Sequence, residues 1–165
     1  MSATIEIAKQ YGASPGTEGI ITGLALKSVD DATTTGPNAP ITIPTSGTSY
    51  SYESWLRFKC TAAPDNEVGS FKIWGSGSAI QSGAFVITVN TDSVTSYATP
   101  VNTESEQGTR ADLADHGSAS KISVGGTLDA EGEYTDFVVL QAEVTSSALP
   151  GNVAQQTIYY EYTET

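Results

Sequence analysis

Hydrophobic and polar positions alternate with a period of two along most of the chain. The clearest case is the segment 49–60, where one face would hold Tyr50, Tyr52, Leu56, Phe58 and Cys60, and the other Glu53, Trp55, Arg57 and Lys59. Such alternation is typical of a half-buried strand. Similar segments predict further strands at 4–8, 20–26, 41–43, 70–74, 84–90, 94–98, 121–124, 134–144 and 157–162. Because Gly, Pro, Asn and Asp separate them, we expect an all-β antiparallel sandwich of jelly-roll or immunoglobulin-like type.

The segment 102–120 breaks this pattern, because it is long and polar and has only Leu113 as a large apolar residue. We expect a projecting loop there. No change of composition marks a linker, so the pattern predicts one domain over residues 1–165. The predicted core consists of Tyr52, Leu56, Phe58, Cys60, Phe71, Ile73, Phe85, Ile87, Val89, Val138, Leu140, Ile158 and Tyr160.

The composition excludes several classes of protein. The chain has 7 Lys and Arg against 19 Asp and Glu, a net charge of -12, which argues against a nucleic-acid surface because phosphate contacts need clustered cations. No apolar run approaches the roughly 18 residues of a membrane helix. The first ten residues lack the pattern of a secretory signal, so we expect none. A single cysteine excludes an internal disulfide framework.

The residues that could carry catalysis are few and poorly placed for it. The only histidine, His116, lies between Asp112 and Ser118 in the polar segment, where a rigid catalytic triad is not expected. Cys60 falls on the apolar face of its strand, which predicts a buried structural thiol. No phosphate-binding loop of the GxxxxGK[ST] type occurs. The sequence therefore predicts a protein that is not an enzyme and has no cofactor.

Metal binding has one weak candidate. One Cys and one His argue against a zinc site. Asp129, Glu131, Glu133 and Asp136 lie on a turn that bends at Gly132, and carboxylates in such an arrangement can bind calcium. An acidic protein also places carboxylates on turns for solubility. The prediction is therefore no metal, with these four residues as the alternative.

Two tryptophans fall on the polar faces of neighbouring predicted strands. If those strands pair, Trp55, Arg57, Lys59, Lys72 and Trp74 share a face that holds three of the seven cations. Three interpretations stay open: a second side of the core, a protein interface, for which Trp and Arg are typical anchors, or an aromatic platform for a sugar ring.

Three stretches carry a resemblance to a known class of proteins. They are YSYESWLRFKCTAAPDNEVGSFKIWGSG (50–77), ITVNTDSVTSYATPVNT (87–103) and NVAQQTIYYEYTET (152–165), the last preceded by Pro150-Gly151. They resemble small β-rich structural proteins of tailed bacteriophages, over residues 49–165. The resemblance implies a virion component, either a capsid decoration (cement) protein or a tail, neck or baseplate part, and it implies no catalytic residues.

The physical properties of the chain are consistent with that expectation. A virion protein is made in the host cytoplasm and assembles without disulfides, and an acidic chain would stay outside the packaged DNA. The predicted function is non-enzymatic stabilisation of the head shell by contact with the major capsid protein or other virion subunits. We expect a homo-oligomer, for example a trimer at a local three-fold axis. The alternative is a carbohydrate-binding module that uses Trp55 and Trp74.

Overall fold

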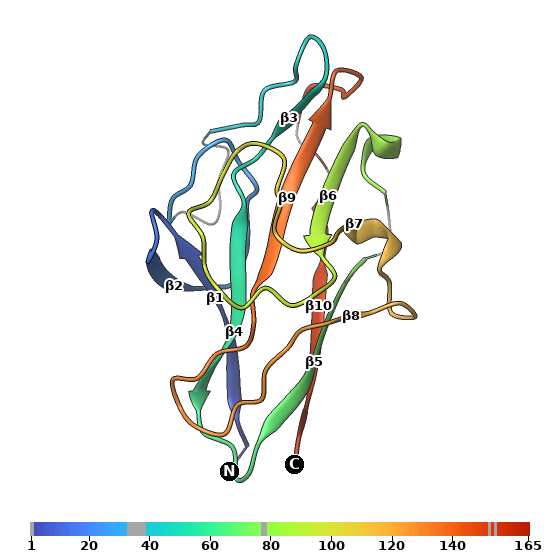
Figure 1. Ribbon diagram of the computed structural model, residues 1–165. Coiled ribbons are helices and arrows are strands. Elements are labelled where there is room, and N and C mark those ends of the chain that lie inside the picture. The colour runs from blue at the N-terminus through green and yellow to red at the C-terminus, as the bar shows by residue number, and fades with distance from the viewer. Residues whose placement is uncertain (1, 33–38, 77–78, 152, 154) are drawn as a thin grey trace.

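The strands form two antiparallel sheets that pack as a β-sandwich, as Figure 1 shows. The computed structural model describes residues 2–32, 39–76, 79–151, 153 and 155–165. The strands are β1 (Thr4–Tyr11), β2 (Thr17–Ile21), β3 (Thr48–Tyr50), β4 (Ser54–Ala62), β5 (Val68–Gly75), β6 (Phe85–Asn90), β7 (Arg110–Asp112), β8 (Ile122–Ser123), β9 (Val138–Thr145) and β10 (Ile158–Glu164). Two short 3₁₀ turns, η1 (Gln81–Gly83) and η2 (Leu113–Asp115), join them. The all-β sandwich predicted from the alternation is confirmed.

The two sheets differ in width. The larger sheet has the order β2-β1-β4-β9-β6-β7, and β3 also pairs with β9; the smaller sheet has the order β10-β5-β8. β3 lies opposite residues 143–145 and β4 lies opposite 138–140, so β3 and β4 are two parts of one interrupted strand. Every pairing between the described strands is antiparallel. A sheet of three strands therefore lies against one that is twice as wide.

The main core lies between the sheets. Phe58 of β4 and Phe71 of β5 stack with their ring centroids 5.2 Å apart. Eight predicted core residues are buried: Leu56, Phe58, Cys60, Phe71, Ile73, Val89, Val138 and Leu140. Tyr52, Phe85, Ile87 and Ile158 are half-buried. Tyr160 is 41% exposed because β10 forms an edge of the smaller sheet.

The segment 102–120 lies on the sandwich instead of projecting from it. β7 pairs with β6, and Leu113 of η2 is 3% exposed. The guanidinium of Arg110 donates hydrogen bonds to the carbonyl oxygen of Val139 (2.7 Å) and to Thr88 Oγ1 (3.0 Å). The expectation of a projecting loop was wrong, because side-chain hydrogen bonds rather than apolar periodicity hold this polar segment.

Two predicted strands are not strands in the structure. Residues 41–43 have no strand pairing, and within 94–98 only Val94 makes an isolated bridge, to Phe137. Val94 packs with Trp55 and Phe137 in a second buried cluster, against which Tyr97 also packs. The apolar residues of 94–98 therefore cover one face of the larger sheet.

Candidate functional site

The five residues predicted as an interface or ligand platform do not share one face. Trp55, Arg57 and Lys59 lie on β4 of the larger sheet, whereas Lys72 and Trp74 lie on β5 of the smaller sheet. β4 pairs with β1 and β9, and β5 pairs with β10 and β8, so the chain crosses between the sheets where a hairpin was considered. The outward side chains of the two strands point to opposite sides of the sandwich.

Trp55 belongs to the core. It is fully buried, and its ring lies edge-on at 5.2 Å from the centroids of both Tyr97 and Phe137. Its indole Nε1 donates a hydrogen bond of 3.0 Å to Glu53 Oε2. Of the three interpretations of the tryptophans, the core is correct for Trp55, which cannot contact a sugar or a partner.

A buried polar network beside Trp55 holds residues 103–105 against the larger sheet, and the sequence did not predict it. Glu53 is 1% exposed and accepts hydrogen bonds from Trp55 and from Ser105 Oγ (2.5 Å). Gln141 is fully buried; its Oε1 accepts the Ser105 N–H (2.9 Å) and its Nε2 donates to the Thr103 carbonyl (2.8 Å). The signal in the sequence was a glutamine inside the apolar run of β9, since a buried amide needs partners from another segment.

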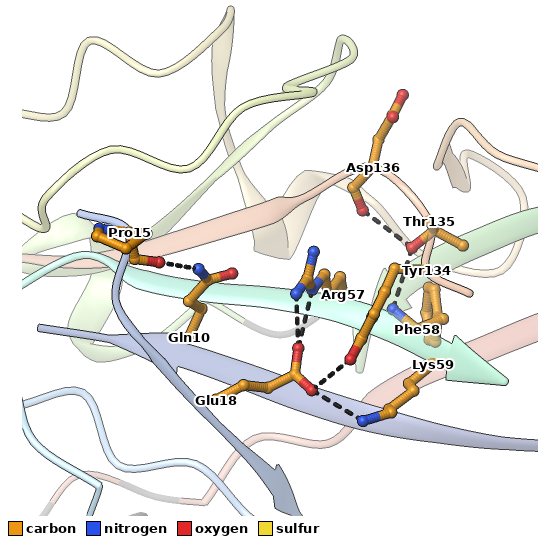
Figure 2. Close-up of polar contacts among 9 residues, drawn as sticks. All are labelled: Gln10, Pro15, Glu18, Arg57, Phe58, Lys59, Tyr134, Thr135 and Asp136. Atoms are coloured by element: carbon orange, nitrogen blue, oxygen red, sulfur yellow. Dashed lines mark hydrogen bonds and ion pairs between the residues drawn. The ribbon is translucent and has the colours of Figure 1, made fainter. Parts of the chain in front are cut away.

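Four side chains on the outer face of the larger sheet form what we call the Glu18 cluster: Glu18, Arg57, Lys59 and Tyr134 (Figure 2). Glu18 Oε2 accepts hydrogen bonds from Arg57 Nη2 (2.6 Å) and Nε (3.1 Å). Its Oε1 accepts hydrogen bonds from Lys59 Nζ (3.0 Å) and from the Tyr134 hydroxyl (2.8 Å). The Arg57 guanidinium lies 3.6 Å from the centroid of the Tyr134 ring, a cation–π contact.

The strand register brings this cluster together. β1 lies between β2 and β4, and Gln10 pairs with Glu18 on one side and with Trp55 on the other. A glutamate on β2 can therefore reach across β1 to the cations two and four residues after Trp55. Sequence alternation predicted the face of Arg57 and Lys59, but it could not give the strand order that supplies Glu18.

The hydrogen bonds decide the charge state of the cluster. Partial burial would raise the pKa of Glu18, but the hydrogen bonds from Arg57, Tyr134 and Lys59 outweigh it and hold this pKa below its usual value. Hydrogen bonds to Tyr134 and Glu18 raise the pKa of Lys59. At neutral pH the cluster holds two cations and one anion. Its net charge of +1 contrasts with a chain of net charge -12.

A second group, the Trp74 cluster, covers the outer face of the smaller sheet and comprises Lys72, Trp74, Lys121, Tyr159 and Glu161. Tyr159 stacks on Trp74 at 5.6 Å between ring centroids, and Lys121 Nζ lies 4.5 Å from the Trp74 centroid. Glu161 forms ion pairs with Lys121 (2.6 Å) and Lys72 (3.9 Å). This cluster also has two cations and one anion.

The geometry of the Trp74 cluster bears on sugar binding. Tyr159 comes from β10 on one side of β5, and Lys121 comes from the start of β8 on the other side. Trp74 therefore has contacts from both neighbouring strands. Trp55 is buried and cannot serve as an aromatic platform for a sugar.

The four calcium candidates do not converge on one point. Glu133 Oε2 accepts the N–H groups of Asp129 (2.6 Å) and Ala130 (3.1 Å), and these hydrogen bonds lower its pKa. Glu133 thus closes the turn on which it lies. Asp129, Glu131 and Asp136 form no ligand set with it: among the described residues, no three His, Cys, Asp or Glu side chains could hold a metal ion. Asp129, Glu131 and Glu133 therefore belong to a turn, whereas Asp136 lies beyond it, with its N–H bonded to the Gly125 carbonyl.

In the histidine region, His116 and Asp112 contact backbone groups. His116 Nδ1 lies 2.8 Å from the Ser120 carbonyl oxygen, and the Asp112 carboxylate accepts the Ala114 N–H at 2.9 Å. The hollow beside Leu113 has a volume of about 20 Å³, room for about one water molecule. Cys60 is buried, and burial raises the pKa of its thiol.

Comparison with known proteins finds no matching family model, no similar curated protein and no similar solved structure. Among the described residues, no helix has the length and apolar character needed to cross a membrane. The function must therefore be argued from the surfaces of the sandwich.

Proposed function

We propose that the chain is a non-enzymatic structural protein of a tailed-phage virion, a capsid decoration protein that stabilises the head shell by packing on its subunits. The observation that carries this proposal is the position of the cations. Lys9 and Lys27 are buried, and Arg110 is bound to the backbone of β9. The other four of the seven, Arg57, Lys59, Lys72 and Lys121, form the Glu18 and Trp74 clusters.

The two clusters lie on opposite outer faces of a rigid sandwich. Each gathers two of the seven cations of an acidic protein, so each fits an acidic patch on a neighbouring subunit. Charge complementarity of this kind fixes orientation and rejects wrong partners more than it adds affinity. A subunit with two such faces can bridge two neighbours, which is the mechanical task of a cement protein.

The stabilisation would come from buried area repeated around the shell. Standard interfaces bury roughly 800 Å² on each partner, and a decoration protein repeats that contact at every equivalent site. No chemistry is required. The partners in this proposal are the major capsid protein or other virion subunits, and assembly takes place in the host cytoplasm.

The net charge favours an external position, because a chain of charge -12 is repelled by packaged DNA. The same two faces could serve a tail, neck or baseplate part. The particle fraction that captures the protein distinguishes these locations.

The proposal is tested by co-sedimentation of the purified protein with empty shells of the phage that encodes it, with and without added salt. Lys72→Glu reverses a side chain that is 43% exposed and contributes only a long ion pair to the fold. We expect it to weaken binding by about tenfold, and we expect salt to weaken binding of the unaltered protein.

Glu106→Lys is the matched control, because it changes one exposed charge that belongs to neither cluster. It should leave binding equal or slightly stronger. If neither salt nor Lys72→Glu weakens binding, the Trp74 cluster is not part of the interface. A protein that stays in the supernatant with heads, tails and baseplates alike would contradict the proposed function.

A further inference from the structure

We propose that β10 is a self-association edge, at which two copies of this chain pair their β10 strands antiparallel to form one continuous six-stranded sheet. This inference does not depend on the proposed function, since it concerns the purified protein alone. Among the described residues, β10 pairs only with β5, so its other side is an unpaired edge.

The hydrogen bonding of β5 shows which backbone groups face that edge. The N–H of Thr165 donates to the Glu67 carbonyl on the β5 side. The N–H and C=O groups of successive residues in a strand point alternately to its two sides. The bulge in this pairing places its extra residue in β5, next to Ser70 with its positive φ of 55°, so the alternation along β10 is not interrupted. The backbone N–H and C=O groups of Ile158, Tyr160 and Tyr162 therefore point away from β5. A second strand could form hydrogen bonds with them on that side.

Two large aromatic side chains along this edge are exposed. Tyr159 is 47% exposed and Tyr160 is 41% exposed, although Tyr160 packs inward on Phe58. Ile158 and Tyr162 of β10 are partly buried and pack against the main core. The smaller sheet has three strands, with β10 at one edge. An added strand would cover Tyr160 and the apolar side chains beside it.

The strand is complementary to itself in the register centred on Tyr160. When Tyr160 lies opposite Tyr160 of the second copy, Ile158 lies opposite Tyr162, and Tyr159 lies opposite Glu161. These pairs combine apolar and aromatic groups and bring no like charges face to face. A shift of the centre by one residue, to Glu161, would place two glutamates opposite each other.

The lysines of the Trp74 cluster reduce the electrostatic repulsion between two acidic chains at this edge. In the register centred on Tyr160, one outer row would read Lys121, Trp74, Tyr159, then Glu161 and Lys72 of the second copy. The carboxylate of Glu161 is already paired with a lysine on its own chain. With Lys72 and Lys121 set against Glu161 and Glu164, this region is locally neutral, in contrast to the chain as a whole, and this favours a second copy as the partner.

The contact is one strand long, smaller than the interfaces of permanent dimers, so we expect association that depends on concentration. Light scattering and sedimentation over a wide concentration range should show the mass rise from one chain to two. Tyr160→Lys places two cations at the centre of the contact and should raise the dissociation constant by about tenfold or more. Tyr160→Phe keeps the ring and should leave it unchanged.

Cysteine pairs test the register and do not depend on the stability of the Tyr160 variants. Positions 159 and 161 of opposite copies would form a non-hydrogen-bonded pair with Cα atoms about 4.5 Å apart, within the range for a disulfide. A mixture of Tyr159→Cys and Glu161→Cys should cross-link under mild oxidation. A mixture of Tyr159→Cys and Thr163→Cys, matched to the register centred on Glu161, should not. The native Cys60 is buried and would not compete.

Two results would overturn the inference. One is a monomer at every concentration with no cross-link from any pair of variants. The other is protection of the β10 amides from hydrogen exchange only when shells are added. That result would mean that the edge pairs with a strand of another virion subunit.

Discussion

Trp55 and Glu53, two residues apart at the start of β4, are joined by a buried hydrogen bond from the indole Nε1 to Oε2, 3.0 Å long. Tryptophan is 0% exposed and glutamate 1%. The period-2 pattern placed Trp55 on the polar face of its strand, but in the structure this residue is part of the core. The larger sheet has no bare outer face here, because residues 94–105 cover it.

This hydrogen bond gives the first prediction. Glu53 accepts from Trp55 and Ser105, and Val101 N–H lies 3.4 Å from Oε2. Glu53→Gln replaces one acceptor oxygen by an NH₂ group that faces donors. We expect it to lower the free energy of unfolding by about 1–3 kcal/mol, measured by urea denaturation. Glu104→Gln, an exposed neighbour, should change it by less than about 0.5 kcal/mol; equal effects of both would contradict a buried network.

The Glu18 cluster predicts a specific pH dependence. The pKa of Glu18 is held below its usual value near 4.5, so the ionised form stabilises the fold above that pH and the contribution is lost as pH falls through the lowered pKa. Glu18→Gln should cost about 1–2 kcal/mol at pH 7.

The same variant should also show a flatter fall in stability below pH 4.5 than the unaltered protein. Denaturant unfolding at pH 7 and at several acidic pH values measures both effects. Glu131→Gln, an exposed carboxylate on the 128–134 turn, is the control and should keep the original slope. An unchanged acid slope in Glu18→Gln would show that the cluster does not form in solution.

A pair of glycines predicts opposite effects of the same substitution. Gly126 has a φ of 118°, and a Cβ there would lie 2.9 Å from Thr135 Cα, a backbone atom. Gly126→Ala should therefore destabilise the protein by more than about 1 kcal/mol. At Gly19, in β2, an added Cβ would meet no heavy atom within 4 Å, so Gly19→Ala should be neutral or slightly stabilising. Thermal unfolding of the two variants measures both effects. If Gly126→Ala is as stable as the unaltered protein, residues 125–136 do not have the arrangement described here.

The covered tryptophan ring predicts the outcome of a glycan screen. Since Tyr159 stacks on Trp74 and Lys121 lies 4.5 Å from its ring centroid, we expect no carbohydrate to bind through it. Trp74→Ala should lower stability by removing the stacked pair, and a glycan array should show no signal that depends on Trp74. A glycan signal that disappears in Trp74→Ala while the variant stays folded would favour carbohydrate binding over the structural proposal.

The sequence predicted the fold class because period-2 alternation is a local property. β4, β5, β6 and β10 lie close to where the apolar pattern placed them. Strand order is not local: the link between β4 and β5 could be a hairpin or a crossing between sheets, and only the packing of Phe58 on Phe71 shows that the strands face each other.

Polar residues were the harder part for the same reason. Glu18 joins Arg57 across an intervening strand, and Gln141 holds a segment almost 40 residues before it. Neither pairing has a periodic signature. The segment 102–120 was expected to project because its attachment uses hydrogen bonds, which composition does not reveal.

The most direct test of the proposed function is the thermal stability of shells stripped of small proteins and then saturated with this protein. We expect binding at a fixed ratio to the shell subunits and a higher temperature of shell opening, both reduced by Lys72→Glu. Shells that open at the same temperature with and without the protein, with no bound protein in the shell fraction, would contradict the proposal.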